Sequence, residues 1–156
     1  MQNAPSHESF KFRHVLVATD FEAASARTLE YATELATRLG AELTVMHAWE
    51  VPRSAYAPEF YAANDVAGLV ADAAAHQLEQ TAGILRQRMP FAKSLLRSGD
   101  PAQTIAKSAE EIGADVVVVG RNNGRIEHML LGSVSERLIR ICRMPVIVIP
   151  HPSGTA

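Results

Sequence analysis

The sequence is poor in the residues that build disulfides, metal centres and nucleic-acid surfaces. It has one cysteine, Cys142, which excludes an internal disulfide and a cysteine-rich metal site and suits a reducing compartment. No Cys-x-x-Cys or His-x-x-x-His spacing occurs, which disfavours a transition-metal site built from the protein. The net charge of −2, with acidic and basic residues interspersed, gives no reason to expect a nucleic-acid or membrane-surface partner.

Long apolar runs are missing as well. No stretch approaches the roughly 20 apolar residues that a membrane-spanning helix needs. The polar start of the chain lacks the basic-then-apolar order of a secretory signal, so we expect a cytoplasmic protein. The 156 residues, 47% of them hydrophobic, suit one domain with a substantial core. We expect a flexible N-terminal arm over 1–11, a domain over 12–150 and a polar tail over 151–156.

Short apolar runs alternate with helical periodicity along the chain. The run Val116–Val119 is apolar throughout, as in a strand covered on both faces. Asp100, Pro101 and Gln103 form a capping-box pattern that predicts the start of a helix. The alternation predicts a doubly wound α/β fold with a five-stranded, mainly parallel sheet and helices on both faces. The expected strands cover 14–19, 43–48, 91–97, 115–120 and 146–149, and the expected helices lie around 29–39, 65–89, 101–112 and 133–141.

Two of these helices have apolar residues at the spacing of one face. Gly40 follows the first of them, at the position where a helix usually stops in the left-handed conformation. We expect the apolar faces to turn inward. The residues concerned are Leu29, Ala32, Leu35, Ala36 and Leu39 in the first helix, and Val134, Leu138 and Ile141 in the last.

Two of the expected strands end on residues suited to a ligand site. In an open parallel sheet, ligands bind beyond the carboxyl ends of the strands, where the strand order reverses. Thr19 and Asp20 follow the first strand, and the Asp20 carboxylate can accept bonds from ribose hydroxyls or hold a metal. Gly120 ends the fourth strand, and Gly132-Ser133 opens a helix whose N–H groups and dipole favour a phosphate. The same Gly-Ser pair also suits a plain helix cap.

Several segments resemble the universal stress protein family. The similarity spans about residues 12–150, in the family's order and spacing. It implies the strand order 3-2-1-4-5, which places the reversal between the first and fourth strands. The matching segments are Val15–Phe21, Gly99–Ala102 with Ile105, Val117–Gly120, Leu130–Glu136 and Met144–Ile149.

The resemblance also implies where ATP, with or without Mg²⁺, would bind. In ATP-binding members the adenine and ribose lie near the Asp of the first strand and the end of the second strand. The phosphates lie against a loop of the pattern Gly-x-x-Gly, nine residues, Gly-Ser/Thr. Carried over, the nucleotide-binding residues are Ala18, Asp20, Ala48, Val119, Gly120, Gly124, Arg125, Gly132, Ser133 and Val134.

The middle of that loop departs from the family pattern. Gly120 and Gly132 are separated by eleven residues, one fewer than in the family. The second glycine is either replaced by Asn123 or displaced to Gly124, and arginines of the loop such as Arg125 can offer charge-assisted phosphate bonds. The shortened loop equally fits a branch of the family that does not retain ATP.

Two further features, His47 and the aromatic residues of 49–63, each allow two interpretations. His47, at the end of the second strand, either contacts a nucleotide base or is a core residue hydrogen-bonded to backbone. The aromatic residues of 49–63 form either a lid over the crevice or a plug at the end of the core.

The last strand is expected at an edge of the sheet. An apolar edge favours association unless it is covered, and in the family this strand pairs with its twofold mate. The resemblance therefore implies a homodimer. Its interface would be formed by Val146, Ile147, Val148 and Ile149.

The leading hypothesis is a stress-response protein that binds ATP and acts as a sensor or adaptor. Any ATP hydrolysis is expected to be slow, because the sequence places no general base beyond Asp20, no arginine finger and no metal-binding carboxylate pair. The alternative is a nucleotide-free dimeric stress protein that acts as an interaction module. An adenylating or nucleotide-cleaving enzyme is the weakest hypothesis, because fold alone does not confer chemistry.

Overall fold

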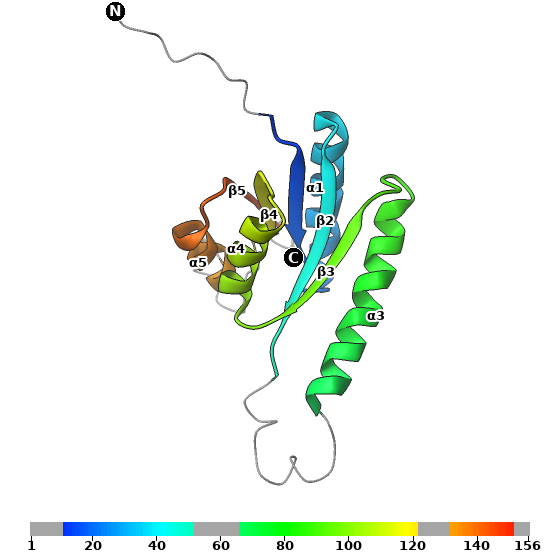
Figure 1. Ribbon diagram of the computed structural model, residues 1–156, viewed down its shortest axis with the longest axis vertical. Helices are drawn as coiled ribbons and strands as arrows, with labels where there is room; N and C mark the ends of the chain where they lie inside the picture. The colour runs from blue at the N-terminus through cyan, green and yellow to red at the C-terminus, as the bar shows by residue number, and fades with distance from the viewer. Residues whose placement is uncertain (1–10, 52–65, 122–131, 152–156) are drawn as a thin grey trace, which may run out of the picture.

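A computed structural model of the chain describes residues 11–51, 66–121 and 132–151 (Figure 1). Within them, the expected strands and helices are all present, with ends that differ by a few residues. The elements are β1 (His14–Ala18), α1 (Ser25–Leu39), β2 (Glu42–Trp49), α3 (Val66–Arg86), β3 (Lys93–Ser98), α4 (Pro101–Glu111), β4 (Val116–Gly120), α5 (Ser133–Ile141) and β5 (Val146–Ile149).

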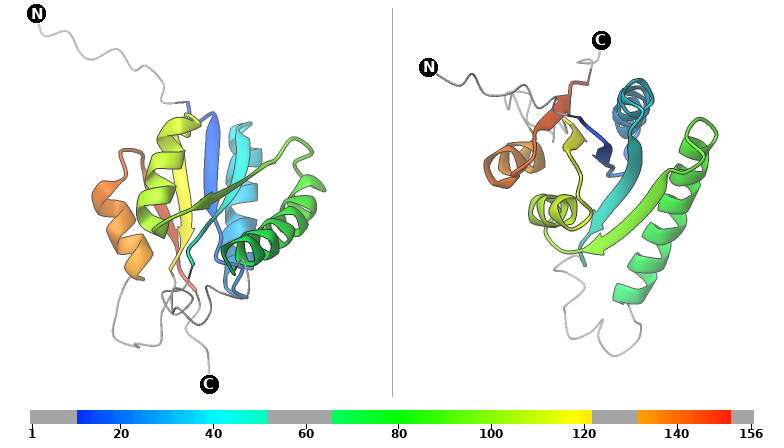
Figure 2. Two further views of the ribbon diagram at one scale, coloured as in Figure 1. Left: turned by 60° about the horizontal axis from the view of Figure 1, so that its bottom comes forward. Right: turned by 45° about the horizontal axis from the view of Figure 1, so that its top comes forward.

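The five strands form one parallel sheet in the order β3-β2-β1-β4-β5, as the resemblance implied. The order reverses at β1, which pairs with β2 on one side and with β4 on the other. Helices α1 and α3 cover one face of the sheet, and α4 and α5 cover the other (Figure 2). The fold is therefore doubly wound, and its ligand crevice is expected at the carboxyl ends of β1 and β4.

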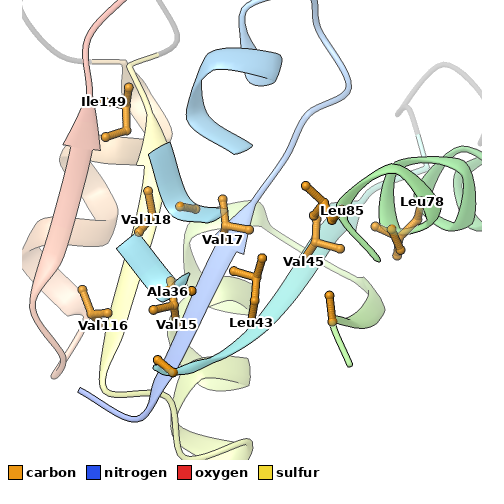
Figure 3. Close-up of a cluster of buried hydrophobic side chains, with 14 residues drawn as sticks. Val15, Val17, Ala36, Leu43, Val45, Leu78, Leu85, Val116, Val118 and Ile149 are labelled. Carbon is orange, nitrogen blue, oxygen red and sulfur yellow. The ribbon is translucent and has the colours of Figure 1, made fainter. Parts of the chain in front are cut away.

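The core lies on both faces of the sheet because alternate residues of each strand point to opposite sides. Val15, Leu16 and Val17 of β1 have no exposed surface. Val15 and Val17 pack with α1 and α3 (Figure 3), whereas Leu16 packs with α4 and α5. This two-sided burial is why Val15–Val17 of β1 and Val116–Val119 of β4 are continuous apolar runs, without the alternation of polar residues seen in half-exposed strands.

Asp115 fixes where the two central strands begin. Its Oδ2 accepts hydrogen bonds from the N–H of Arg13 at 2.7 Å and of His14 at 2.9 Å. From there β1 and β4 pair in register, with Val15 opposite Val116. Residues about a hundred positions apart in the chain are thus held together at the amino ends of the strands.

Two predicted helix ends are confirmed. The Asp100 carboxylate caps α4 by accepting the N–H of Gln103 at 3.1 Å, and Pro101 is the first helical residue. At the end of α1, Gly40 takes the left-handed conformation with φ 62°. Both features follow from local sequence rules for helix termini.

Two residues expected to face inward do not. Leu39 is 42% exposed and Ile141 is 46% exposed. Each is the last residue of its helix, one turn past the last buried residue of the same face, Ala36 in α1 and Leu138 in α5. The apolar periodicity therefore continues beyond the part of the helix that covers the sheet.

In the described part of the chain, no helix combines the length and apolar character that crossing a bilayer requires.

Candidate functional site

A cavity of about 130 Å³ lies at the carboxyl ends of β1, β2 and β4, where the strand order reverses. Its walls come from these strands, from the first turns of α1, α4 and α5, and from the residues after β5. Six of the residues predicted to bind nucleotide meet here: Ala18, Asp20, Ala48, Val119, Gly120 and Val134. Sequence reasoning did not include Ser25, Pro101, Ile105, Ser135 and His151, which line the same cavity.

One side of the cavity is apolar. Ala18 is the last residue of β1 and Ala48 the last but one of β2, and their small side chains leave room above the sheet. Pro101 and Ile105 of α4 face them, and Val134 of α5 continues the same wall. A flat, largely apolar ring is the kind of group that such a surface accommodates, because it can be buried there without leaving a polar group unpaired.

Asp20 lines the cavity and also organises the turn between β1 and α1. Its Oδ1 accepts the N–H of Glu22 at 3.0 Å and the hydroxyl of Ser25 in a short hydrogen bond. The carboxylate therefore stabilises the start of α1 while its side chain remains exposed at the crevice. The N-cap residue of α1 is Ala24, so Asp20 acts through the turn before the helix, a role that was not foreseen from the sequence.

Phe21, in the same turn, adopts the left-handed backbone conformation with φ 64°. This conformation is unusual for a bulky residue. Its N–H donates to Thr19 Oγ1 at 3.1 Å, and its ring stacks on that of His47 with centroids 4.2 Å apart. The strained turn is thus held by a hydrogen bond and an aromatic contact.

His47 makes the hydrogen bond to backbone that one of the two interpretations from the sequence expected. Its Nδ1 lies 2.7 Å from the carbonyl oxygen of Thr19. Because a carbonyl oxygen only accepts, Nδ1 carries the hydrogen of this bond. The side chain is half-buried and also lines the cavity, so a backbone-bonded histidine and a residue of the crevice wall are the same residue here.

Gly120 is placed where a side chain would not fit. A Cβ atom there would lie 2.7 Å from Thr28 Oγ1 and 3.2 Å from His151 Nε2. The carbonyl oxygen of Gly120 accepts the hydroxyl of Ser135 at 2.9 Å, which ties the end of β4 to the first turn of α5. Close packing of α1 and of the residues after β5 therefore explains the glycine, independently of any ligand.

Gly132 and Ser133 do not line the cavity in the part of the chain that the structure describes. Gly132 is the N-cap residue of α5, and its carbonyl oxygen accepts the N–H of Glu136 at 2.9 Å. Ser133 is the first helical residue and no side chain caps this helix, so of the Gly-Ser pair it is Gly132 that occupies the cap position. Gly124, Arg125 and the aromatic residues of 52–63 lie outside the described residues.

Two walls of the cavity are joined by an ion pair. The guanidinium of Arg137 in α5 donates to both oxygens of Asp100, at 2.7 and 3.0 Å. These bonds hold the pKa of Asp100 below its ordinary value, the Gln103 N–H lowers it further, and the pKa of Arg137 is raised in turn. The sequence marked Asp100 as a helix cap, but nothing in it identified the partner 37 residues away.

The described residues contain no cluster of side chains suited to bind a metal ion. No group of three or more His, Cys, Asp or Glu side chains among those residues could hold one. Asp20 is the one carboxylate among the described residues that line the cavity.

The model of the universal stress protein family matches residues 11–150. The chain belongs to the universal stress protein family. It is 29% identical over 150 residues to universal stress protein YxiE of Bacillus subtilis, covering 88% of this chain and 99% of YxiE.

Solved structures of the family share the fold. Protein MJ0577 of Methanocaldococcus jannaschii superposes with a TM-score of 0.74 at 21% identity, covering 92% of this chain and 99% of that chain. A universal stress protein solved in complex with cAMP gives a TM-score of 0.66 at 22% identity, with coverage of 91% and 99%. One from Archaeoglobus fulgidus solved in complex with dAMP gives 0.63 at 22% identity, with coverage of 89% and 98%.

Proposed function

We propose that the chain binds an adenine nucleotide, ATP in the first instance, in this crevice and acts as a stress-response sensor or adaptor. The observation that carries the proposal is the cavity at the strand-order reversal, where Ala18, Asp20, Ala48 and Gly120 meet. Ligands of doubly wound sheets bind at this position. Two structurally similar family members were solved with cAMP and dAMP, which supports an adenine nucleotide as the ligand class.

The size of the cavity indicates which part of the nucleotide it takes. Pockets for whole drug-sized ligands enclose about 300–1,000 Å³. The described cavity, at about 130 Å³, suits one portion of a nucleotide. We assign the base to the apolar wall of Ala48, Pro101 and Ile105, and the ribose hydroxyls to the Asp20 side, where a carboxylate can accept them.

The phosphates are assigned to the side of Gly120. Asp20, which is negative, would repel them from the opposite side. Gly124, Arg125, Gly132 and Ser133 are the proposed phosphate contacts beyond the described cavity, and Val119 and Val134 support the wall beneath them. Any Mg²⁺ would be held chiefly by the phosphates, since Mg²⁺ commonly binds through substrate phosphates and one or two carboxylates.

Fast hydrolysis is not part of the proposal. A general base must lie within hydrogen-bond reach of the attacking water, and Asp20 already uses Oδ1 for the N–H of Glu22 and the hydroxyl of Ser25. With Asp20 as the one carboxylate lining the described cavity, we expect at most slow turnover. We further propose a cytoplasmic location, on the ground of the single cysteine.

Freshly purified protein, denatured and analysed by mass spectrometry for released adenine nucleotide, tests the proposal together with calorimetric titration of ATP. We expect a dissociation constant of about 1 μM, near −8 kcal/mol. Ala48→Leu, which fills the cavity, should abolish the binding heat, whereas Ala75→Leu on the exposed side of α3 should not. No released nucleotide and no binding heat with the wild-type chain would refute the proposal.

The exposed edge of the sheet favours a second candidate, a homodimeric interaction module without nucleotide. Within the described sheet, β5 pairs with β4 alone. Ile147 in the middle of β5 is 37% exposed, and Val146 and Val148 are half-buried. An apolar edge strand of this kind is suited to pair with a second copy of itself. Dimerisation is compatible with both candidates, and nucleotide binding separates them.

A further inference from the structure

His151 is brought to the crevice by the pairing of β4 with β5. The two strands are parallel, with Gly120 opposite Ile149. The N–H of Arg121 donates to the carbonyl oxygen of Ile149 at 2.8 Å, which extends the pairing by one step. The residues that follow Ile149 are thus held beside the point where the chain leaves β4, and the imidazole of His151 lines the cavity there.

The imidazole occupies the space that Gly120 leaves open. Its Nε2 lies 3.2 Å and its Cε1 3.6 Å from the position that a Cβ of residue 120 would take. Because residue 120 has no side chain, the Nε2 edge of the ring can lie next to the backbone of β4. This is the side of the crevice assigned to the phosphates.

Among the described residues, no hydrogen-bond partner competes with a ligand for the ring of His151. It makes no hydrogen bond to any residue that the structure describes, and it is half-buried. His47, the other imidazole in the cavity, already donates its Nδ1 hydrogen to Thr19. The two histidines therefore differ in what they can offer, although both line the same space.

Three other charged or titratable residues lie in the cavity wall or next to Gly120. Asp20 contributes a carboxylate from the turn after β1, His47 faces the cavity from β2, and Arg121 follows Gly120 directly. Among side chains that change charge between pH 5 and 8, imidazole is the usual one, and a protonated imidazole donates strong hydrogen bonds to phosphate oxygens.

We propose that His151 binds the phosphate group of the nucleotide, and that protonation of its imidazole strengthens this binding. The inference rests on the proposed function, which it extends by naming a phosphate-binding residue from outside the loop after β4. A ligand that binds the protonated imidazole more tightly raises the proton affinity of that imidazole. By linkage, the affinity of the protein for the ligand then rises as the pH falls.

The test uses two probes that differ in charge. cAMP is a phosphodiester that stays anionic throughout the range, unlike phosphate monoesters, which titrate near pH 6. Adenosine carries no phosphate. Titration calorimetry of the full chain at about pH 5.5 and about pH 8 should show cAMP binding about five- to tenfold tighter at the lower pH, and adenosine binding changed less than about twofold.

Three variants assign the effect. His151→Gln should bind cAMP with the same affinity at both pH values and should leave adenosine binding unchanged. His47→Asn, which can still donate to Thr19, and His76→Gln, at an exposed position of α3, should keep the pH dependence of the wild type. Thermal unfolding of each variant checks that the fold is intact.

The outcomes separate the two proposals. Binding of cAMP and adenosine with a pH dependence that survives His151→Gln, or that disappears in His47→Asn, overturns the role of His151 and leaves the proposed function standing. If the wild-type chain binds neither probe at either pH, both the proposed function and the role of His151 fail.

Discussion

Arg137 on α5 donates two hydrogen bonds to Asp100, the residue whose carboxylate also caps α4. One carboxylate thus serves a helix terminus and an ion pair between two helices. Since Pro101 of α4 and Val134 of α5 both line the crevice, the pair also fixes the distance between two of its walls.

Substitutions at Asp100 should separate the cap from the ion pair. Asp100→Asn keeps a good capping residue and loses the charge, whereas Asp100→Ala loses both. We expect Asp100→Ala to lower the free energy of unfolding by about 0.5–2 kcal/mol and Asp100→Asn by less than about 1 kcal/mol, because Arg137 is half-exposed and such pairs contribute little. Urea unfolding measures both. Equal losses in the two variants would mean that the ion pair, and not the cap, is the larger contribution.

The same carboxylate should make stability depend on acid pH. Because the folded-state pKa of Asp100 lies below its unfolded value, its contribution is complete above the ordinary pKa of an aspartate and is lost as the pH falls through the lower folded-state value. The wild type should therefore lose more stability than Asp100→Asn between about pH 5 and about pH 2. Other carboxylates with lowered pKa, such as Glu34 and Glu79, are common to both proteins and cancel in the comparison. Parallel pH profiles of the two proteins would contradict this expectation.

Gly120→Ala should destabilise the fold without any reference to a ligand. The added methyl group would stand 2.7 Å from Thr28 Oγ1, a buried hydroxyl without a hydrogen-bond partner among the described residues. Overpacking of this kind costs about 1–3 kcal/mol. Thr28→Ala in the same chain should recover part of that loss, giving a coupling free energy of about 1 kcal/mol in a double-mutant cycle. Strictly additive effects would show that the two positions do not clash.

Ile147→Lys should disrupt the proposed homodimer. A charge in the middle of β5 opposes edge-to-edge pairing, and Ile147 is the most exposed residue of that strand. Sedimentation velocity should show a dimer for the wild type and a monomer for the variant, with little change in the circular dichroism spectrum. Lys107→Ala, on exposed α4 surface, serves as the control and should stay dimeric. If the wild type is monomeric at micromolar concentration, the proposed homodimer is refuted for both candidate functions.

Much of the fold could be predicted because its signals are local. β4 is buried on both faces and is therefore a continuous apolar run, and Asp100 with Pro101 marks a helix start by rules that need no tertiary contact. Asp20 was predicted from the rule for ligand sites in parallel sheets, whereas Ala18 and Ala48 were predicted from the family resemblance.

The remaining cavity residues could not be predicted in this way. His151 reaches the site through the register of β4 and β5, and Ser135 through a bond to the carbonyl oxygen of Gly120. Neither has a local pattern, because each position depends on where another part of the chain is placed. Packing against Thr28 and His151 accounts for a glycine at position 120 by itself, and this contact could not be seen in the sequence.

The pairing of β1 with β4 has a consequence for how the chain is made. The Asp115 carboxylate that anchors the start of β1 emerges from the ribosome 102 residues after Arg13. At about 5–20 residues per second, β1 waits about 5–20 s for its neighbour. During that time the edge of β1 that will pair with β4 is open, although β2, α1 and α3 have already been made. The strand at the centre of the finished sheet therefore has one unpaired edge during most of synthesis, and an open edge of this kind favours aggregation until β4 pairs with it.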